Sequence, residues 1–238
     1  MTWSIIAHEP ASGVFGIAVA TRFFAVGALV PHIAPQLGAV ATQALVNPLY
    51  GTHGLRLLRA GMPAPAVVHT LTAGDAGRDH RQVHVIDPAG RIAAHTGAQC
   101  VGWCGALEGP GYSLAGNMLA GPDVLADTAK IFTANATMPL AQRLICAMRA
   151  GEAAGGDKRG KQSAALLIYD EEEWPALDLR VDDHVDPLAE LERLEVVSRE
   201  RFVHFRRCLP SQRNPVGITD RDLIEAEIAR SLAAETRP

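Results

Sequence analysis

The chain has 238 residues, of which 48% are hydrophobic and 20% are charged, so it has the composition of a globular protein and not of a largely disordered one. Its formal net charge of −4 offers no clustered positive potential, which excludes nucleic acid and anionic membrane surfaces as expected partners. No apolar run is long enough to span a bilayer, and the N-terminus lacks the pattern of a signal peptide. We therefore expect a cytoplasmic protein.

The first predicted element is a β-hairpin. Its strands run from Thr2 to His8 and from Val14 to Thr21, around the turn sequence Glu9 to Gly13. Both strands are apolar on both faces, which predicts a sheet that is covered on both sides. A further strand, from Gly38 to Leu45, contains the polar pair Thr42-Gln43.

The middle of the chain alternates pairs of helices with pairs of strands. Two short helices are predicted on either side of Gly61-Met62-Pro63, because apolar residues recur there at helical spacing. Strands are predicted over 81–87, 91–96, 101–107 and 112–116, and helices over 122–133 and 139–151. Strands and helices therefore come in blocks, which favours antiparallel sheets with helices outside over βαβ alternation. A four-layer αββα sandwich of the α+β class meets these conditions.

The C-terminal third begins with a glycine-rich polar loop, Gly155 to Gln162, that runs directly into an apolar strand, Ser163 to Tyr169. A last strand is predicted from Leu177 to Asp182, followed by a charged helix from Pro187 to Arg207. We expect one domain over residues 1–207. Residues 208–238 have little capacity to form a core, so we expect an appendage, possibly a contact in a homodimer or higher homo-oligomer.

Residues that would indicate a metal or cofactor site are absent as motifs. The four cysteines lack zinc-ligand spacing and are expected to be reduced thiols. His80 and His84 lie four apart at the start of a strand, but the histidines are expected to be structural or surface residues. The chain has no Walker loop, dinucleotide fingerprint or Gly-x-Ser-x-Gly elbow, so we expect no cofactor and no metal.

Seven segments in chain order resemble the DUF1028 family of uncharacterised bacterial proteins. They are Thr2–Ala7, Phe15–Phe23, Gly38–Ala44, Arg81–Gln82, Thr96–Gly97, Gly116–Gly121 and Gly155–Leu166. The similarity runs from Thr2 to about Leu194. The resemblance implies the αββα fold of the N-terminal-nucleophile (Ntn) hydrolases, the superfamily that includes proteasome subunits and penicillin acylase. It does not supply a substrate.

The resemblance also implies a catalytic role for Thr2. In Ntn hydrolases the first residue of the mature chain is the nucleophile, and its α-amine, which titrates near pH 8, is the general base. Thr2 follows Met1 directly, and a residue as small as threonine permits removal of the methionine. The ordinary alternative is that threonine is a strong strand former and begins this strand for that reason alone.

Four charged or polar residues are candidates to support Thr2. Arg22 ends the second strand, where it could lower the pKa of the α-amine or hold a substrate carboxylate; otherwise it is a surface arginine. In the glycine-rich loop, Asp157 and Arg159 are expected to form an ion pair that shapes the site, with Arg159 also available to bind substrate. Ser163 is a candidate to orient the α-amine. The alternative for the whole loop is a charged surface turn.

Polar residues at other strand ends complete the candidate site. Asn117 is a candidate oxyanion or substrate-amide contact, because a side-chain amide can stabilise developing negative charge. Thr42, Gln43 and Gln82 are candidates for substrate binding. No lysine occurs before Lys130, so the lysine that proteasome subunits carry close to the nucleophile has no counterpart in the early strands.

These features favour a cofactor-free hydrolase that cleaves a small amide or peptide-like C–N bond through an acyl intermediate on Thr2. One alternative is a catalytically silent protein that keeps the fold as a ligand-binding or oligomeric scaffold. Another is an enzyme that uses the same cleft with Asp157 as its general base.

Overall fold

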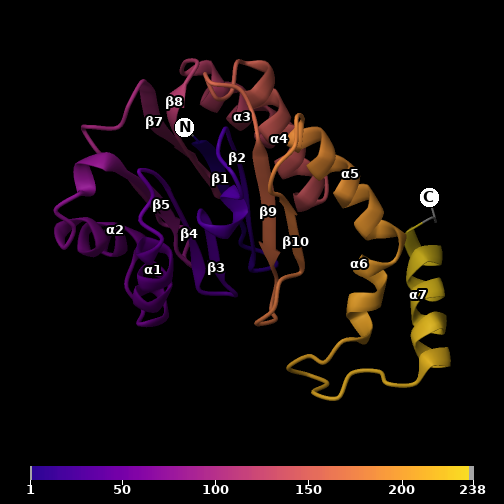
Figure 1. The fold of residues 1–238 in the computed structure, drawn as a ribbon. Coiled ribbons are helices and arrows are strands. Elements are labelled where there is room, and N and C mark those ends of the chain that lie inside the picture. The colour runs from indigo at the N-terminus through magenta and orange to yellow at the C-terminus, as the bar shows by residue number, and fades with distance from the viewer. Residues whose placement is uncertain (1, 236–238) are drawn as a thin grey trace. The chain divides into compact units, whose positions relative to one another are not determined.

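The N-terminal hairpin forms the middle of a six-stranded antiparallel sheet in the computed structural model, which describes residues 2–235 (Figure 1). The strand order is β10-β9-β2-β1-β8-β7. The strands are β1 (Thr2–Glu9), β2 (Val14–Thr21), β7 (Trp103–Gly109), β8 (Tyr112–Leu119), β9 (Ser163–Tyr169) and β10 (Leu177–Val181). Thr2 therefore begins a central strand, paired with Thr21 on one side and Asn117 on the other.

A second antiparallel sheet has four strands in the order β3-β4-β5-β6. They are β3 (Pro31–Ala34), β4 (Gly38–Ala44), β5 (Arg81–Ile86) and β6 (Ile92–Thr96). Its inner face packs on the first sheet in a shared core that includes Ile17 and Val19 of β2 and Ala41 of β4. The sequence did not predict β3, a four-residue strand that starts with Pro31 at the sheet edge, where a missing N–H is tolerated.

Two helices cover the outer face of each sheet (Figure 1). On the four-stranded sheet lie α1 (Leu49–Arg59) and α2 (Ala64–Ala73), and on the six-stranded sheet lie α3 (Asp123–Ala134) and α4 (Leu140–Ala153). Gly16 of β2 allows the close approach of α4, because a Cβ there would lie 2.8 Å from Leu144 Cδ1. These layers confirm the predicted α+β class and the αββα sandwich with two antiparallel sheets between helices.

The C-terminal helices are α5 (Pro187–Glu200), α6 (Phe202–Phe205) and α7 (Arg221–Glu235). The prediction of one helix from Pro187 to Arg207 was wrong, because Arg201 has φ −151 and ends the helical path after Glu200. By compactness the chain divides between Glu192 and Arg193, which is earlier than the boundary expected after Arg207. Within the second unit, buried His204 bonds through Nδ1 to Ser231 Oγ at 2.8 Å. The expected role of residues 208–238 as an appendage stays a prediction.

No helix among residues 2–235 combines the length and apolarity that a membrane crossing requires. The removal of Met1, on which the α-amine mechanism depends, falls outside the described residues.

Candidate functional site

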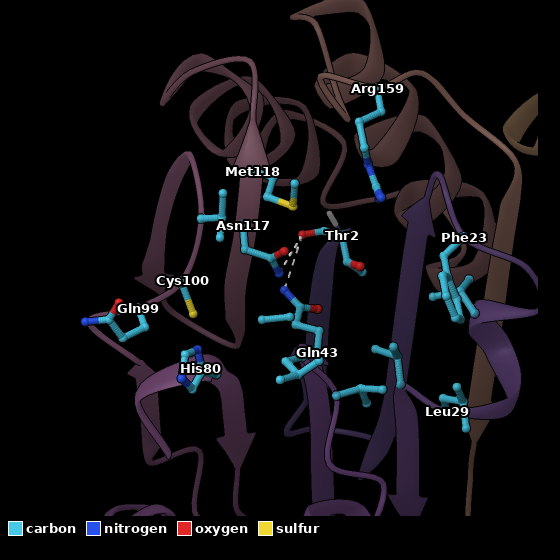
Figure 2. A pocket seen from close by; sticks show the side chains of 16 residues that line it. Thr2, Phe23, Leu29, Gln43, His80, Gln99, Cys100, Asn117, Met118 and Arg159 are labelled. Carbon is cyan, nitrogen blue, oxygen red and sulfur yellow. Dashed lines mark hydrogen bonds between the residues drawn. The ribbon is translucent and has the colours of Figure 1, made fainter. Parts of the chain in front are cut away.

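Thr2 is held in place by bonds from both sheets. Its hydroxyl Oγ1 donates to Thr21 Oγ1 at 3.1 Å, and only 7% of the residue is exposed. Its carbonyl oxygen accepts from Gln43 Nε2 and from Asn117 Nδ2, both at 3.4 Å (Figure 2). Gln43 belongs to β4 of the second sheet, and Asn117 to the neighbouring strand β8. The start of β1 is therefore fixed by side chains from three other strands.

A cavity of about 470 Å³, here called the Thr2 cavity, opens beside this residue. Four of the predicted site residues line it, namely Thr2, Gln43, Asn117 and Arg159 (Figure 2). Its other lining residues are Phe23, Val26, Leu29, Val30, Ala44, Leu45, Val46, His80, Gln99, Cys100, Val101 and Met118. Sequence reasoning missed these twelve, most of which are apolar residues in loops without a motif.

The ion pair expected in the glycine-rich loop is present. Arg159 Nη2 lies 3.2 Å from Asp157 Oδ2, and the Asp157 side chain is only 1% exposed. The two carboxylate oxygens of Asp157 also accept from the backbone N–H groups of Arg22, at 2.7 Å, and of Arg159, at 2.8 Å. Asp157 thus ties the end of β2 to its own loop. Arg22 and Asp157 lie beside the lining of the Thr2 cavity and are not part of it.

Ser163 supports a wall of the cavity. Its hydroxyl donates to the carbonyl oxygen of Phe23 and accepts from the N–H of Val26 at 3.2 Å. These bonds hold the segment 23–26, in which Ala25 has a left-handed φ of 53. The hydroxyl thus spends its bonds on a loop backbone, and a role in orienting the α-amine stays a prediction.

Gln82 and Thr42 lie below the cavity, fully buried. Gln82 Nε2 donates to Thr96 Oγ1 and to two backbone carbonyls, and its Oε1 accepts from Gln43 Nε2 at 2.8 Å and Asn117 Nδ2 at 3.1 Å. Thr42 Oγ1 donates to the carbonyl oxygen of Asn47 at 3.2 Å. Neither residue lines the cavity. Their contacts support the residues that do, and direct substrate binding by them stays a prediction.

Two lining residues have strained backbone. Ala44 has φ 71 and Met118 has φ 53, in the left-handed region that costs a non-glycine residue about 1–2 kcal/mol. Each directly follows one of the amides that bond to the Thr2 carbonyl, Gln43 and Asn117. Strain of this kind persists only where the surroundings fix it, and it concentrates at functional sites.

A charged cluster fixes the wall at Leu45. Arg81 donates through Nη1 to the carbonyl oxygen of Leu45 and lies with Nε 3.1 Å from Asp75 Oδ2. Asp75 also accepts from Tyr50 Oη at 2.8 Å and from the N–H of Gly77 at 2.7 Å. These donors outweigh the opposing effect of burial and lower the pKa of Asp75 to about 2. The carboxylate therefore stays charged and holds this wall over the working pH range.

Cys100 is a second residue of nucleophilic type in the Thr2 cavity. Burial, together with the neighbouring Cys104, raises the pKa of its thiol, and its Sγ donates to the carbonyl oxygen of Arg81 at 3.4 Å. The thiolate is the reactive form of cysteine, so this environment makes Cys100 a poor nucleophile.

A buried hydrogen-bond network joins the two sheets below Thr2. Ser4 Oγ donates to Gln43 Oε1 at 2.7 Å, so it can only accept from His84 Nε2, which lies 2.9 Å away. His84 Nδ1 then accepts from Ser113 Oγ, also at 2.9 Å. His84 is thereby a neutral imidazole protonated at Nε2. Its complete burial lowers its pKa to about 3, which agrees with the expectation that it is structural.

This network predicts a dependence of stability on pH. The unfolded chain binds a proton at His84 near pH 6.5, whereas the folded chain does so near pH 3, so the unfolding free energy falls as the pH drops between these values. The slope from one such group approaches about 1.4 kcal/mol per pH unit. Urea unfolding of the wild type and His84→Gln from pH 7 to 4 measures it. We expect the shallower slope in the variant; equal slopes would contradict the assignment. His8 and His32, whose pKa values burial also lowers, are common to both proteins and cancel.

Comparison with known proteins gives a family and two similar structures. Residues 2–191 match the model of a family described as a family of unknown function, DUF1028. Protein SPO2555 from Silicibacter pomeroyi, a DUF1028 protein, is 32% identical, with a TM-score of 0.85 over 92% of this chain and 96% of that one. Anbu (ancestral beta-subunit) from Yersinia bercovieri is 13% identical, with a TM-score of 0.42 over 82% of this chain and 95% of that one. No curated protein matches.

Proposed function

This chain belongs to the DUF1028 family, whose function is unknown, and from the geometry of its site we propose that it hydrolyses a small amide or peptide-like C–N bond with Thr2 as an N-terminal nucleophile. One observation carries the proposal: Thr2 begins a central strand and lines a cavity, with its backbone fixed by Gln43 and Asn117. A nucleophile has to be held rigidly against the space that the substrate occupies.

The proposed reaction needs only Thr2 and water. After removal of Met1, Oγ1 gives its proton to the α-amine and attacks the substrate carbonyl carbon. Collapse of the tetrahedral intermediate breaks the C–N bond, and the leaving amine takes the proton from the α-ammonium group. The acyl group is now an ester of Thr2. Water then attacks the ester carbonyl with the α-amine as base, which releases a carboxylic acid and restores Thr2.

Thr21 is proposed to orient the nucleophile. Its Oγ1 accepts the hydroxyl proton of Thr2 at 3.1 Å, from the directly paired position on β2. Arg159 is proposed to lower the pKa of the α-amine, because a guanidinium in the cavity lining disfavours a second positive charge nearby. Arg22 can add to this effect from its exposed position beside the loop.

Asn117 is proposed to stabilise the oxyanion by exchanging one bond. Its Nδ2 carries two hydrogens, and both have acceptors, the Thr2 carbonyl at 3.4 Å and Gln82 Oε1 at 3.1 Å. The bond to Thr2 is long for a hydrogen bond of this type, so giving it up for a substrate oxyanion costs little.

The use of Asp157 as a general base is disfavoured by its contacts. Three N–H donors from Arg22 and Arg159 point at its carboxylate, which lowers its capacity to accept a further proton from a substrate. It is proposed instead to position the loop that carries Arg159.

A panel of small amides tests the proposal against a silent scaffold. The purified protein is incubated with amides that differ in acyl group and amine, and release of free amine is measured. We expect turnover of at least one class. Amides that bind, as judged by a rise in Tm, but release no amine across the panel would favour the scaffold.

A further inference from the structure

The Thr2 cavity has two chemically distinct parts. Phe23, Val26, Leu29 and Val30 form an apolar wall on the side where Figure 2 shows Phe23 and Leu29. Phe23 is 55% exposed, so its ring forms part of the entrance to the cavity instead of its core. Apolar walls of this kind select for an apolar part of a ligand, because its burial removes hydrocarbon surface from water.

Arg159 supplies the second part. Figure 2 shows its side chain reaching from the glycine-rich loop toward Thr2, and 42% of the side chain is exposed. Among the described residues that line the cavity, none is an aspartate or glutamate. The guanidinium has five N–H donors in a planar fork, so it can bridge Asp157 and a second carboxylate. The cavity therefore favours an anionic group close to the nucleophile.

We infer, on the basis of the proposed function, that the substrate is an N-acyl amino acid with an apolar acyl group. Its acyl chain lies along the wall formed by Phe23, Val26, Leu29 and Val30, its amide carbonyl lies at Thr2, and its carboxylate pairs with Arg159. A carboxylate two bonds from the scissile nitrogen fits an arginine that reaches toward the nucleophile. Hydrolysis consumes one water and yields a carboxylic acid and a free amino acid.

Binding to the Thr2→Ala protein tests the ligand class without turnover. The probes are N-hexanoylglycine, its neutral carboxamide and N-acetylglycine, measured by isothermal titration calorimetry. We expect N-hexanoylglycine to bind at least about tenfold more tightly than either of the others, since one lost ion pair or several lost methylenes are each worth that factor. Equal affinity for the acid and the carboxamide would overturn the inference.

Two arginine variants locate the anion site. In Arg159→Gln we expect the preference for the acid over the carboxamide to fall below about threefold, with the affinity for the carboxamide unchanged. In Arg22→Gln we expect the preference to remain, because Arg22 is outside the cavity lining. Loss of the preference in Arg22→Gln and not in Arg159→Gln would contradict the assignment to Arg159.

Turnover separates this inference from the proposed function. If the wild type binds N-hexanoylglycine with the expected preference but releases no glycine, the proposed function fails and the ligand class stands. If it cleaves other amides without binding N-acyl amino acids, the ligand class fails and the proposed function stands.

Discussion

Thr2→Ala should reduce amide hydrolysis by about a thousandfold or more, because loss of the nucleophile in covalent catalysis leaves only binding and positioning. Thr2→Ser keeps both the hydroxyl and the α-amine and should retain readily measurable turnover. The measurement is kcat with a substrate found in the amide panel. Parallel thermal unfolding should place the alanine variant within about 1 kcal/mol of wild type, the cost of one hydrogen bond to Thr21.

A comparison at Cys100 keeps this result specific. Cys100 lines the same cavity, and its raised thiol pKa makes it a poor nucleophile. Cys100→Ala should therefore leave hydrolysis within a few-fold of wild type. Full activity in Thr2→Ala, or its loss in Cys100→Ala with Thr2 intact, would assign the nucleophile elsewhere.

Gln82→Leu should lower the free energy of unfolding by about 3–5 kcal/mol. Leucine fills nearly the same volume, so the effect comes from polar groups left without partners, at about 1–3 kcal/mol each. Those groups include the side-chain amides of Gln43 and Asn117 and the carbonyl oxygen of Gly116. Urea unfolding measures the loss. Activity should fall as well, because the same two amides hold the Thr2 carbonyl.

Gln99→Leu is the matched control. Gln99 is an exposed glutamine, so the same substitution there should change stability by no more than about 0.5 kcal/mol. A Gln82→Leu protein as stable as Gln99→Leu would mean that the buried network contributes little to the fold.

The sequence was sufficient to predict elements whose signal is local. Strands apolar on both faces indicated the covered sheet of β1 and β2, and helical spacing on either side of Gly61 indicated α1 and α2. The missed features depend on neighbours in space. Strand β3 is short and gains its identity from pairing with β4, and the break at Arg201 interrupts a pattern that looks continuous in sequence.

The candidate site was predictable where polar residues end apolar strands. Thr2, Gln43 and Asn117 meet because their strands end at the same edge of the two packed sheets. Sequence could not show which polar residues line the cavity and which lie beneath it, because sheet stacking decides that. A signal was available in β5, where Gln82 and His84 alternate with valines and so point to one buried face that must supply hydrogen bonds.

The central claim, that Thr2 acts through its own α-amine, is tested most directly by the mass of the N-terminal peptide of the active protein. The account predicts a chain that begins at Thr2 in the fraction that releases amine from its substrate. A preparation that hydrolyses amides at full rate while every molecule keeps Met1 would contradict it, because the proposed base would then be an amide nitrogen without basicity.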